Sequence, residues 1–218
     1  KTLSILYGMT FEGCSNNKSA GGAVVSANDC VRIVNCTFNQ CSSSEGAGGA
    51  IYFSATGTKS MEDKLQGRFY NYSGSELLDA DYQAVAGSHV CHCTFNSCSS
   101  ANHDGGAIHG VLSETGTVIA DCTFNDCKSP SETPGWGRGG AICDARTVYR
   151  CTFNQCSAGN YGGGCFNAHY IISCLFRKCK SVKGKGGAVS KSNVENTHIL
   201  NSTFDNCKSQ ADGTAIEG

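Results

Sequence analysis

The sequence predicts an all-β protein folded as a right-handed parallel β-helix, a solenoid of about seven to eight coils. Two short phrases recur in fixed order along its 218 residues, apolar and polar residues alternate within the first phrase, and paired glycines open the second. Helical repeats are excluded because the repeats carry glycine pairs and Cys-Thr-Phe triplets instead of runs of good helix formers. Leucine-rich repeats are excluded because their Leu/Asn spacing is missing.

The first phrase places a phenylalanine between two cysteines in most copies, as in CTFNQC. Its copies surround Phe11, Phe38, Phe95, Phe124, Phe153, Phe176 and Phe204. The second phrase, usually GGAI or GGAV, follows each copy and starts at Gly21, Gly48, Gly105, Gly139, Gly163, Gly186 and Gly213. If the 57-residue gap between Phe38 and Phe95 hides one degenerate copy, the mean period is about 28 residues, which suits one coil of a solenoid.

Residues 55–88 leave two interpretations open. Phe38 and Phe95 are separated by 57 residues, and Phe69 lies where a missing phenylalanine is expected. The segment is therefore either a degenerate eighth coil, which we favour, or an irregular protrusion on a stack of seven coils. Under both interpretations, residues 1–218 form a single β-helix domain.

Alternation around each phenylalanine predicts a half-buried strand with its polar residues outward. The positions two and four before the phenylalanine are expected to point inward: Cys36 and Val34, Cys93 and Cys91, Cys122 and Ala120, Cys151 and Tyr149, Cys174 and Ile172. Such strands bury their faces by stacking about 4.8 Å apart from coil to coil. The parallel crossovers then favour a right-handed coil.

The double glycine is expected to supply a corner of positive φ that turns the chain into the next strand. The residues expected to point inward after it are Ile51, Ile108, Ile142, Phe166, Val189 and Ile216. Threonines before the phenylalanine, as in Thr37 and Thr94, form an outward rank with an asparagine two positions on. This rank predicts a flat polar face.

The pairing of GGA[I/V] with F-x-x resembles the repeats of chlamydial polymorphic outer-membrane proteins and similar β-helix repeats in surface proteins of some protists. The resemblance extends from Met9 to Ile216. It implies an extracellular or cell-surface setting and a structural or adhesive role, and it does not imply a bacterial autotransporter. The chain departs from the family by carrying cysteine in place of the asparagine of F-x-x-N, at Cys14, Cys41, Cys98, Cys127, Cys156, Cys179 and Cys207.

The cysteines form two ranks, one three residues after the phenylalanine and one two residues before it. Stacked coils place like cysteines near 5 Å apart, so a buried ladder of thiols and a set of inter-coil disulfides are both open. Cys91-His92-Cys93 looks like a chelate, but alternation points His92 away from the two thiols. The sequence predicts no metal site and no cofactor.

Charge and hydropathy exclude two classes of partner. The formal net charge is -1, from 17 basic and 18 acidic residues, which gives no electrostatic footprint for nucleic acid. No apolar stretch reaches the roughly 18 residues of a membrane span. We therefore expect partners among glycans, surface proteins, a larger parent protein or further copies of the chain.

Catalysis on polysaccharides is the main alternative function, because many parallel β-helices are lyases or hydrolases. Such sites need carboxylates clustered on neighbouring coils. The repeat register aligns no two acids on adjacent coils, and the close pair Asp79 and Asp81 lies in the irregular segment. We expect a protein that is not an enzyme, with a polysaccharide-active enzyme or a glycan-binding module as the alternative.

Irregular surface most often carries recognition. The loop SETPGWGRGG contributes Trp136 and Arg138 as candidate contact residues, and the irregular segment contributes Tyr70 and Tyr72. Candidate glycosylation sequons begin at Asn71, Asn17, Asn35 and Asn201, of which Asn35 and Asn201 are expected on a strand face. Neither end of the repeat array carries a capping helix, so we expect either end-to-end stacking into a fibre or a larger parent protein.

Overall fold

The computed structural model describes residues 4–26, 31–54, 87–112, 116–191, 197–211 and 215–217. These residues form strands and connecting turns, and they contain no helix long and apolar enough to cross a membrane. All strand pairs of the described residues are parallel, and the strands lie in three sheets. The prediction of an all-β stack of parallel strands is confirmed.

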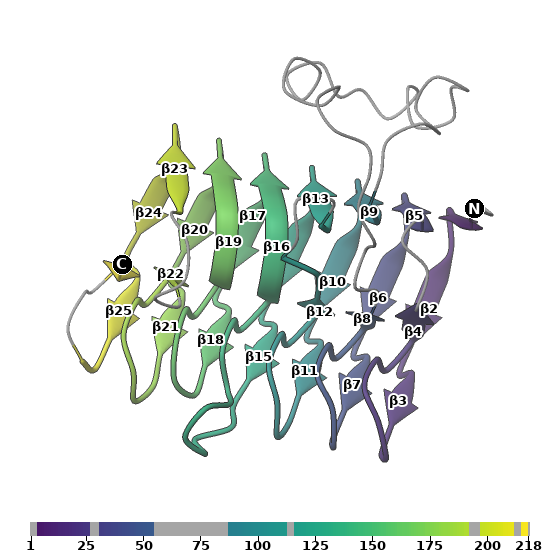
Figure 1. Ribbon diagram of the computed structural model, residues 1–218, viewed down its shortest axis with the longest axis horizontal. Helices are drawn as coiled ribbons and strands as arrows, with labels where there is room; N and C mark the ends of the chain where they lie inside the picture. The colour runs from purple at the N-terminus through teal and green to yellow at the C-terminus, as the bar shows by residue number, and fades with distance from the viewer. Residues whose placement is uncertain are drawn as a thin grey trace.

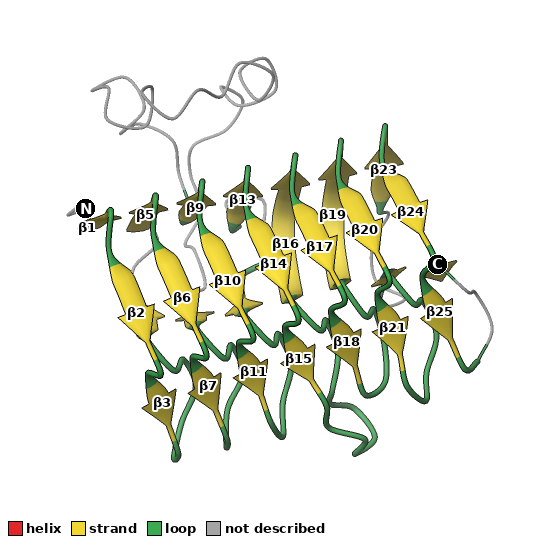
Figure 2. Ribbon diagram, turned by 180° about the vertical axis from the view of Figure 1, so that it is seen from behind, coloured by secondary structure: helices red, strands yellow, loops and turns green. Residues whose placement is uncertain are grey.

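One sheet of seven strands, which we call the phenylalanine sheet, carries the first phrase. Its strands, in spatial order, are β2 (Thr10–Glu12), β6 (Thr37–Asn39), β10 (Thr94–Asn96), β14 (Thr123–Asn125), β17 (Thr152–Asn154), β20 (Leu175–Arg177) and β24 (Thr203–Asp205). They run side by side from the N-terminal to the C-terminal end of the stack (Figure 2). Each phenylalanine pairs with the phenylalanine of the next strand.

A second sheet of seven strands, the serine sheet, follows the first around the coil. Its strands are β3 (Ser15–Asn16), β7 (Ser42–Ser43), β11 (Ser99–Ser100), β15 (Lys128–Ser129), β18 (Ser157–Ala158), β21 (Lys180–Ser181) and β25 (Lys208–Ser209). Buried serines of this sheet bond to backbone carbonyls of the preceding coil, as Ser100 Oγ does to Gly46 O at 2.9 Å.

The third sheet, the long sheet, has twelve strands in two rows. One row holds β4 (Val24–Ser26), β8 (Ile51–Phe53), β12 (Ile108–His109), β22 (Val189–Ser190) and β26 (Ile216–Glu217). The other holds β1 (Ser4–Tyr7), β5 (Val31–Val34), β9 (His89–Cys91), β13 (Val118–Ala120) and β23 (His198–Leu200). The strands β16 (Ile142–Tyr149) and β19 (Cys165–Ile172) run through both rows and are the two longest arrows in Figure 1.

Stacked phenylalanine rings run through the core of the stack. Their centroids are 4.4–5.0 Å apart from Phe11 to Phe204, and no two neighbouring planes differ by more than 9°. Both predicted cysteine ranks, at positions such as Cys122 and Cys127, are buried in the same core. Like side chains therefore meet like side chains along the stack, as the repeat predicts.

Three kinds of corner join the sheets. The first glycine of the second phrase has positive φ, as predicted, with Gly105 at 67°. The other two corners also lie in the left-handed region: the first coil has Gly8 and Gly13 there, and later coils have non-glycine residues, for example His92 and Ser97 with φ of 52° and 51°. Each of these corners leaves the residues on either side of it in different sheets.

The position four before the phenylalanine is buried in three coils, but it lies outside the main core in which it was predicted. Val34, Cys91 and Ala120 pack with Tyr149 in a small separate cluster, whereas the main core takes the residues before them, Ile33, Val90, Ile119, Val148 and Ile171. The left-handed corner at Asn35, His92 and Asp121 breaks the alternation between the two strands. A period of two holds within a strand and cannot be counted across a corner.

The second phrase of the fifth coil lies one residue earlier than predicted. Gly162, with φ of 63°, is the corner residue, and Cys165 pairs with Ile142 and Val189. Cys165 therefore points into the main core, and Phe166, predicted to point inward, does not belong to it. Three consecutive glycines made the frame ambiguous in the sequence, and a shift of one residue exchanges the two faces of a strand.

In the phenylalanine sheet, β6 pairs directly with β10, and the rings of Phe38 and Phe95 are 4.8 Å apart. No strand therefore separates these two coils in this sheet. Phe69 and the rest of residues 55–86 lie outside the described residues.

Replacing a central phenylalanine of the stack is expected to cost far more stability than replacing a terminal one. Phe124→Ala removes a fully buried ring that contacts rings on both sides, and a loss of about 3–5 kcal/mol in the free energy of unfolding is expected. Phe11→Ala removes a half-buried ring with one neighbour and should cost no more than about half of that. Urea denaturation followed by circular dichroism measures both. Equal losses would contradict a continuous core.

Candidate functional site

The two cysteine ladders lie in the core. The fifteen described cysteines are free thiols, and all but Cys14 and Cys207 are buried. Each ladder thiol donates to backbone carbonyls, as Cys122 Sγ does to Val90 O at 3.5 Å and to Ala120 O at 3.1 Å. Burial raises the pKa of Cys122 and Cys127 well above the ordinary value, so these thiols are not nucleophiles.

The outward asparagines of the phenylalanine sheet bond to one another. The side-chain amide of Asn96 donates to Asn39 Oδ1, that of Asn125 to Asn96 Oδ1 and that of Asn154 to Asn125 Oδ1, each at 2.8 Å. The predicted polar face is thus present on these strands. Its amides are largely engaged along the stack, which leaves them little capacity to bind a ligand.

The loop of the fourth coil is held in place by the next coil. Asn160 Nδ2 donates to Trp136 O at 2.6 Å, Thr133 O at 3.1 Å and Ser131 O at 3.3 Å. The indole of Trp136 is 41% exposed and packs against the ring of His103, with a centroid distance of 4.3 Å. A large aromatic side chain is therefore presented to solvent in a fixed position.

Arg138, predicted as a contact residue, is engaged in an ion pair. Its Nη2 and Nε bond to Asp104 Oδ2 at 2.6 and 3.1 Å, and its backbone N–H donates to Asp104 Oδ1 at 2.9 Å. Asp104 is 1% exposed. Burial lowers the pKa of Arg138. The hydrogen bond to Asp104 and the charge of Asp104 together raise it by more, so the pKa lies above its ordinary value.

The guanidinium of Arg138 also connects the loop to the long sheet. It lies 5.9 Å from the ring centroid of Trp136 and 4.9 Å from that of Phe166. Tyr161, on the next coil, is exposed and forms a β-bridge with Arg138. We call Trp136, His103, Tyr161 and the exposed part of Arg138 the aromatic surface.

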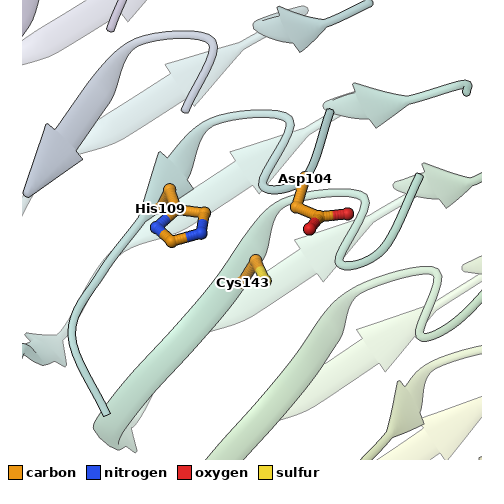
Figure 3. A group of neighbouring side chains, drawn as sticks. All are labelled: Asp104, His109 and Cys143. Carbon is orange, nitrogen blue, oxygen red and sulfur yellow. The ribbon is translucent and has the colours of Figure 1, made fainter. Parts of the chain in front are cut away.

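A cluster of chemically reactive side chains shares Asp104 with the ion pair to Arg138. One ligand-type atom from each of Asp104, His109 and Cys143 lies within 4.8 Å of the other two. Figure 3 shows that Asp104 precedes the turn into β12, that His109 lies on β12 and that Cys143 lies on the adjacent strand β16. We call these three residues the Asp–His–Cys cluster.

Two acidic residues influence this cluster. His109 Nε2 is 3.6 Å from Asp144 Oδ2, and Asn167 Nδ2 donates to Asp144 Oδ1 at 2.7 Å. Burial lowers the pKa of His109, although the charges of Asp144 and Asp104 act in the opposite direction. Burial, reinforced by the same two carboxylates, raises the pKa of Cys143 well above its ordinary value.

The remaining predicted site residues are dispersed. Asn17, Asn35 and Asn201 are exposed, and Asn35 and Asn201 occupy left-handed corners with φ of 52° and 48°, not the strand face on which they were expected. Tyr70, Asn71 and Tyr72 lie outside the described residues. In Cys91-His92-Cys93, the two thiols are buried, and His92 lies at a corner with its Nε2 3.9 Å from Asp121 Oδ2.

Sequence reasoning missed Asp104, His109 and Cys143, although a signal was present. The residue before the glycine pair is Asp104 in one coil and Arg138 in the next, an opposite-charge pair in register. His109 and Cys143 also share a register position, and they pair in the structure. The position of Asp104 comes close to the position of His109 and Cys143 because of the path of the turn between them. An alignment of the repeats does not show this path.

Comparison of the chain with protein-family models, with curated proteins and with solved structures finds no match.

The Asp104–Arg138 pair should contribute much more to stability than an exposed ion pair of the same kind. Asp104→Asn keeps the shape but removes the charge from a buried carboxylate, and we expect a loss of about 2–3 kcal/mol in the free energy of unfolding. The comparison is Arg150→Gln, which removes the more exposed pair to Asp121 and should cost less than about 1 kcal/mol. Urea denaturation of both variants checks this, and equal losses would contradict it.

Proposed function

We propose that this chain is an extracellular structural and adhesive element, a right-handed parallel β-helix of seven coils, that binds a glycan through the aromatic surface. The observation that carries the proposal is the rigid presentation of Trp136, which is exposed although its loop is fixed by Asn160. An exposed aromatic ring held in one conformation loses little entropy on binding and offers a flat apolar face. The C–H face of a sugar ring is complementary to such a surface.

The arrangement of charges favours binding over catalysis. Three carboxylates of this region are each engaged: Asp104 with Arg138, Glu132 with Lys183, and Asp144 with Asn167 and His109. A glycoside hydrolase needs one carboxylic acid and one carboxylate free to act on the glycosidic bond. A lectin-like contact needs only a fixed surface with polar groups at its edge, and His103 and Arg138 provide these.

The free thiols are compatible with an extracellular setting. Oxidation requires an accessible thiolate, and burial of residues such as Cys122 and Cys127 withholds both access and charge. These two thiols are therefore protected from oxidation, whereas hydrogen bonds from neighbouring thiols lower the pKa of Cys93 and of Cys98 to about 4. The same burial makes the thiols part of the apolar core, together with the phenylalanine stack.

Replacing Trp136 should weaken glycan binding without affecting the fold. The wild-type chain is screened on a panel of neutral and acidic glycans, and the affinity for any ligand found is measured by calorimetry. Trp136→Ala is expected to weaken binding at least tenfold, which corresponds to about 1.4 kcal/mol. The matched control is Tyr7→Ala, which removes an exposed aromatic residue from β1, far from the loop.

Two results would overturn the glycan proposal. One is the absence of binding by the wild-type chain across the panel. The other is an affinity of Trp136→Ala equal to that of the wild type, which would move the contact elsewhere.

End-to-end assembly is a second candidate function, favoured by the apolar residues at both ends of the stack. Ile5, Tyr7, Met9 and Val25 in the first coil and Leu200 and Ile216 in the last are between 42% and 58% exposed. The outer edges of these coils present strand backbone that further coils can pair with. A second copy of the chain, or further coils of a parent protein, would cover the edges in the same way.

Light scattering with negative-stain imaging distinguishes end-to-end assembly of this chain from a monomer. Assembly predicts particles heavier than 22.8 kDa and filaments whose axis continues the stack. Ile5→Lys together with Leu200→Lys places a charge on each end face and should restore the monomer, whereas Trp136→Ala should leave the mass unchanged. A wild-type chain that stays at 22.8 kDa at high concentration would exclude assembly of this chain alone.

A further inference from the structure

The Asp–His–Cys cluster combines three types of metal ligand from two adjacent coils. Asp104 and His109 flank the glycine turn of one coil, and Cys143 lies on the strand that pairs with His109 (Figure 3). Their ligand atoms lie within 4.8 Å of one another. Thiolate, imidazole and carboxylate together are a donor set typical of zinc, whereas calcium and magnesium favour sets made of oxygen alone.

One ring nitrogen of His109 is buried and has no partner in the part of the chain that the structure describes. Its Nε2 lies 3.6 Å from Asp144 Oδ2, while its Nδ1 is buried and has no hydrogen-bond partner among the described residues. A buried ring nitrogen without a partner costs free energy that a ligand would recover. Metal-bound histidines commonly have a carboxylate beside the ring, and Asp144 lies beside that of His109.

We propose that Asp104, His109 and Cys143 bind one Zn²⁺ ion, with Asp144 and Arg138 as outer-shell partners. Zinc bonds of about 2.0–2.3 Å in a tetrahedron require ligand atoms roughly 3.5 Å apart, so the three side chains need to close by about 1 Å. Arg138 holds the carboxylate of Asp104 in a fixed orientation through its side chain and its backbone N–H. A water molecule would complete the coordination.

The charges of the cluster balance when zinc binds. Asp104 and Asp144 contribute two negative charges and Arg138 one positive charge. The cluster and its two outer-shell partners together therefore carry −1 while Cys143 is protonated and His109 is neutral. Binding breaks the S–H bond of Cys143, the electron pair stays on sulfur to form the Zn–S bond, and the proton leaves to solvent. The ion adds +2 and the thiolate −1, which brings the total to zero without any change of oxidation state. A neutral cluster is the less costly one to bury.

Cobalt provides a direct test, because a Co²⁺–thiolate bond gives a charge-transfer band in the near ultraviolet. The purified chain of 218 residues, reduced and freed of metal with a chelator, is titrated with Co²⁺ and then with Zn²⁺. The proposal predicts one equivalent of Co²⁺, a thiolate band, and loss of that band as Zn²⁺ displaces the ion. Absence of the band in the wild-type chain would overturn the proposal.

Matched variants assign the band to these residues and not to the ladder thiols. Cys143→Ser and His109→Ala are each expected to lose at least tenfold in affinity, and Asp144→Asn about tenfold. The controls are Cys165→Ser, a buried thiol on the next strand that faces the core, and His169→Ala on the same sheet. Circular dichroism verifies the fold of each variant. A band that survives Cys143→Ser or His109→Ala in folded protein would place the ion elsewhere and overturn the proposal.

Discussion

Adjacent coils lie in register with their stacked rings 4.4–5.0 Å apart, and this spacing limits what each position of a coil can hold. A Cβ on Gly106, the second glycine of its pair, would overlap the carbonyl oxygen of Gly140 in the next coil. The glycine therefore permits the close backbone approach that the parallel hydrogen bonds require. The phenylalanine and cysteine ladders fill the space inside, and each depends on its neighbours keeping the same spacing.

The same register also brings charged residues of consecutive coils into contact. Asp104 and Arg138 occupy equivalent positions in consecutive coils, and this brings their side chains within 2.6 Å of each other. The pair fixes Arg138 beside Trp136, and Asp104 also belongs to the Asp–His–Cys cluster. The proposed glycan contact and the proposed zinc site thus share one ion pair, although they use different atoms and can be tested independently.

Much of the fold could be predicted from the repeats, because a residue repeated at one position of every coil stacks on its own copies. Phe38, Phe95 and Phe124 are stacked as expected, and the cysteines on either side of them are buried. The errors arose at corners. Val34 was placed in the core because the left-handed conformation of Asn35 has no unambiguous sequence signal, and the frame at Gly162 was misread among three glycines.

By itself, the sequence determined the solenoid, the content of its ladders and, outside the coil with three consecutive glycines, the position of the glycine corner. All three follow from a repeat that places equal residues one coil apart. The tertiary structure decided which residues meet across a corner. Asp104 and His109 are five positions apart on one coil, and their approach to each other and to Cys143 depends on the path of the turn between them. Repetition specifies contacts along the stack, whereas backbone dihedrals at the turns specify contacts around the coil.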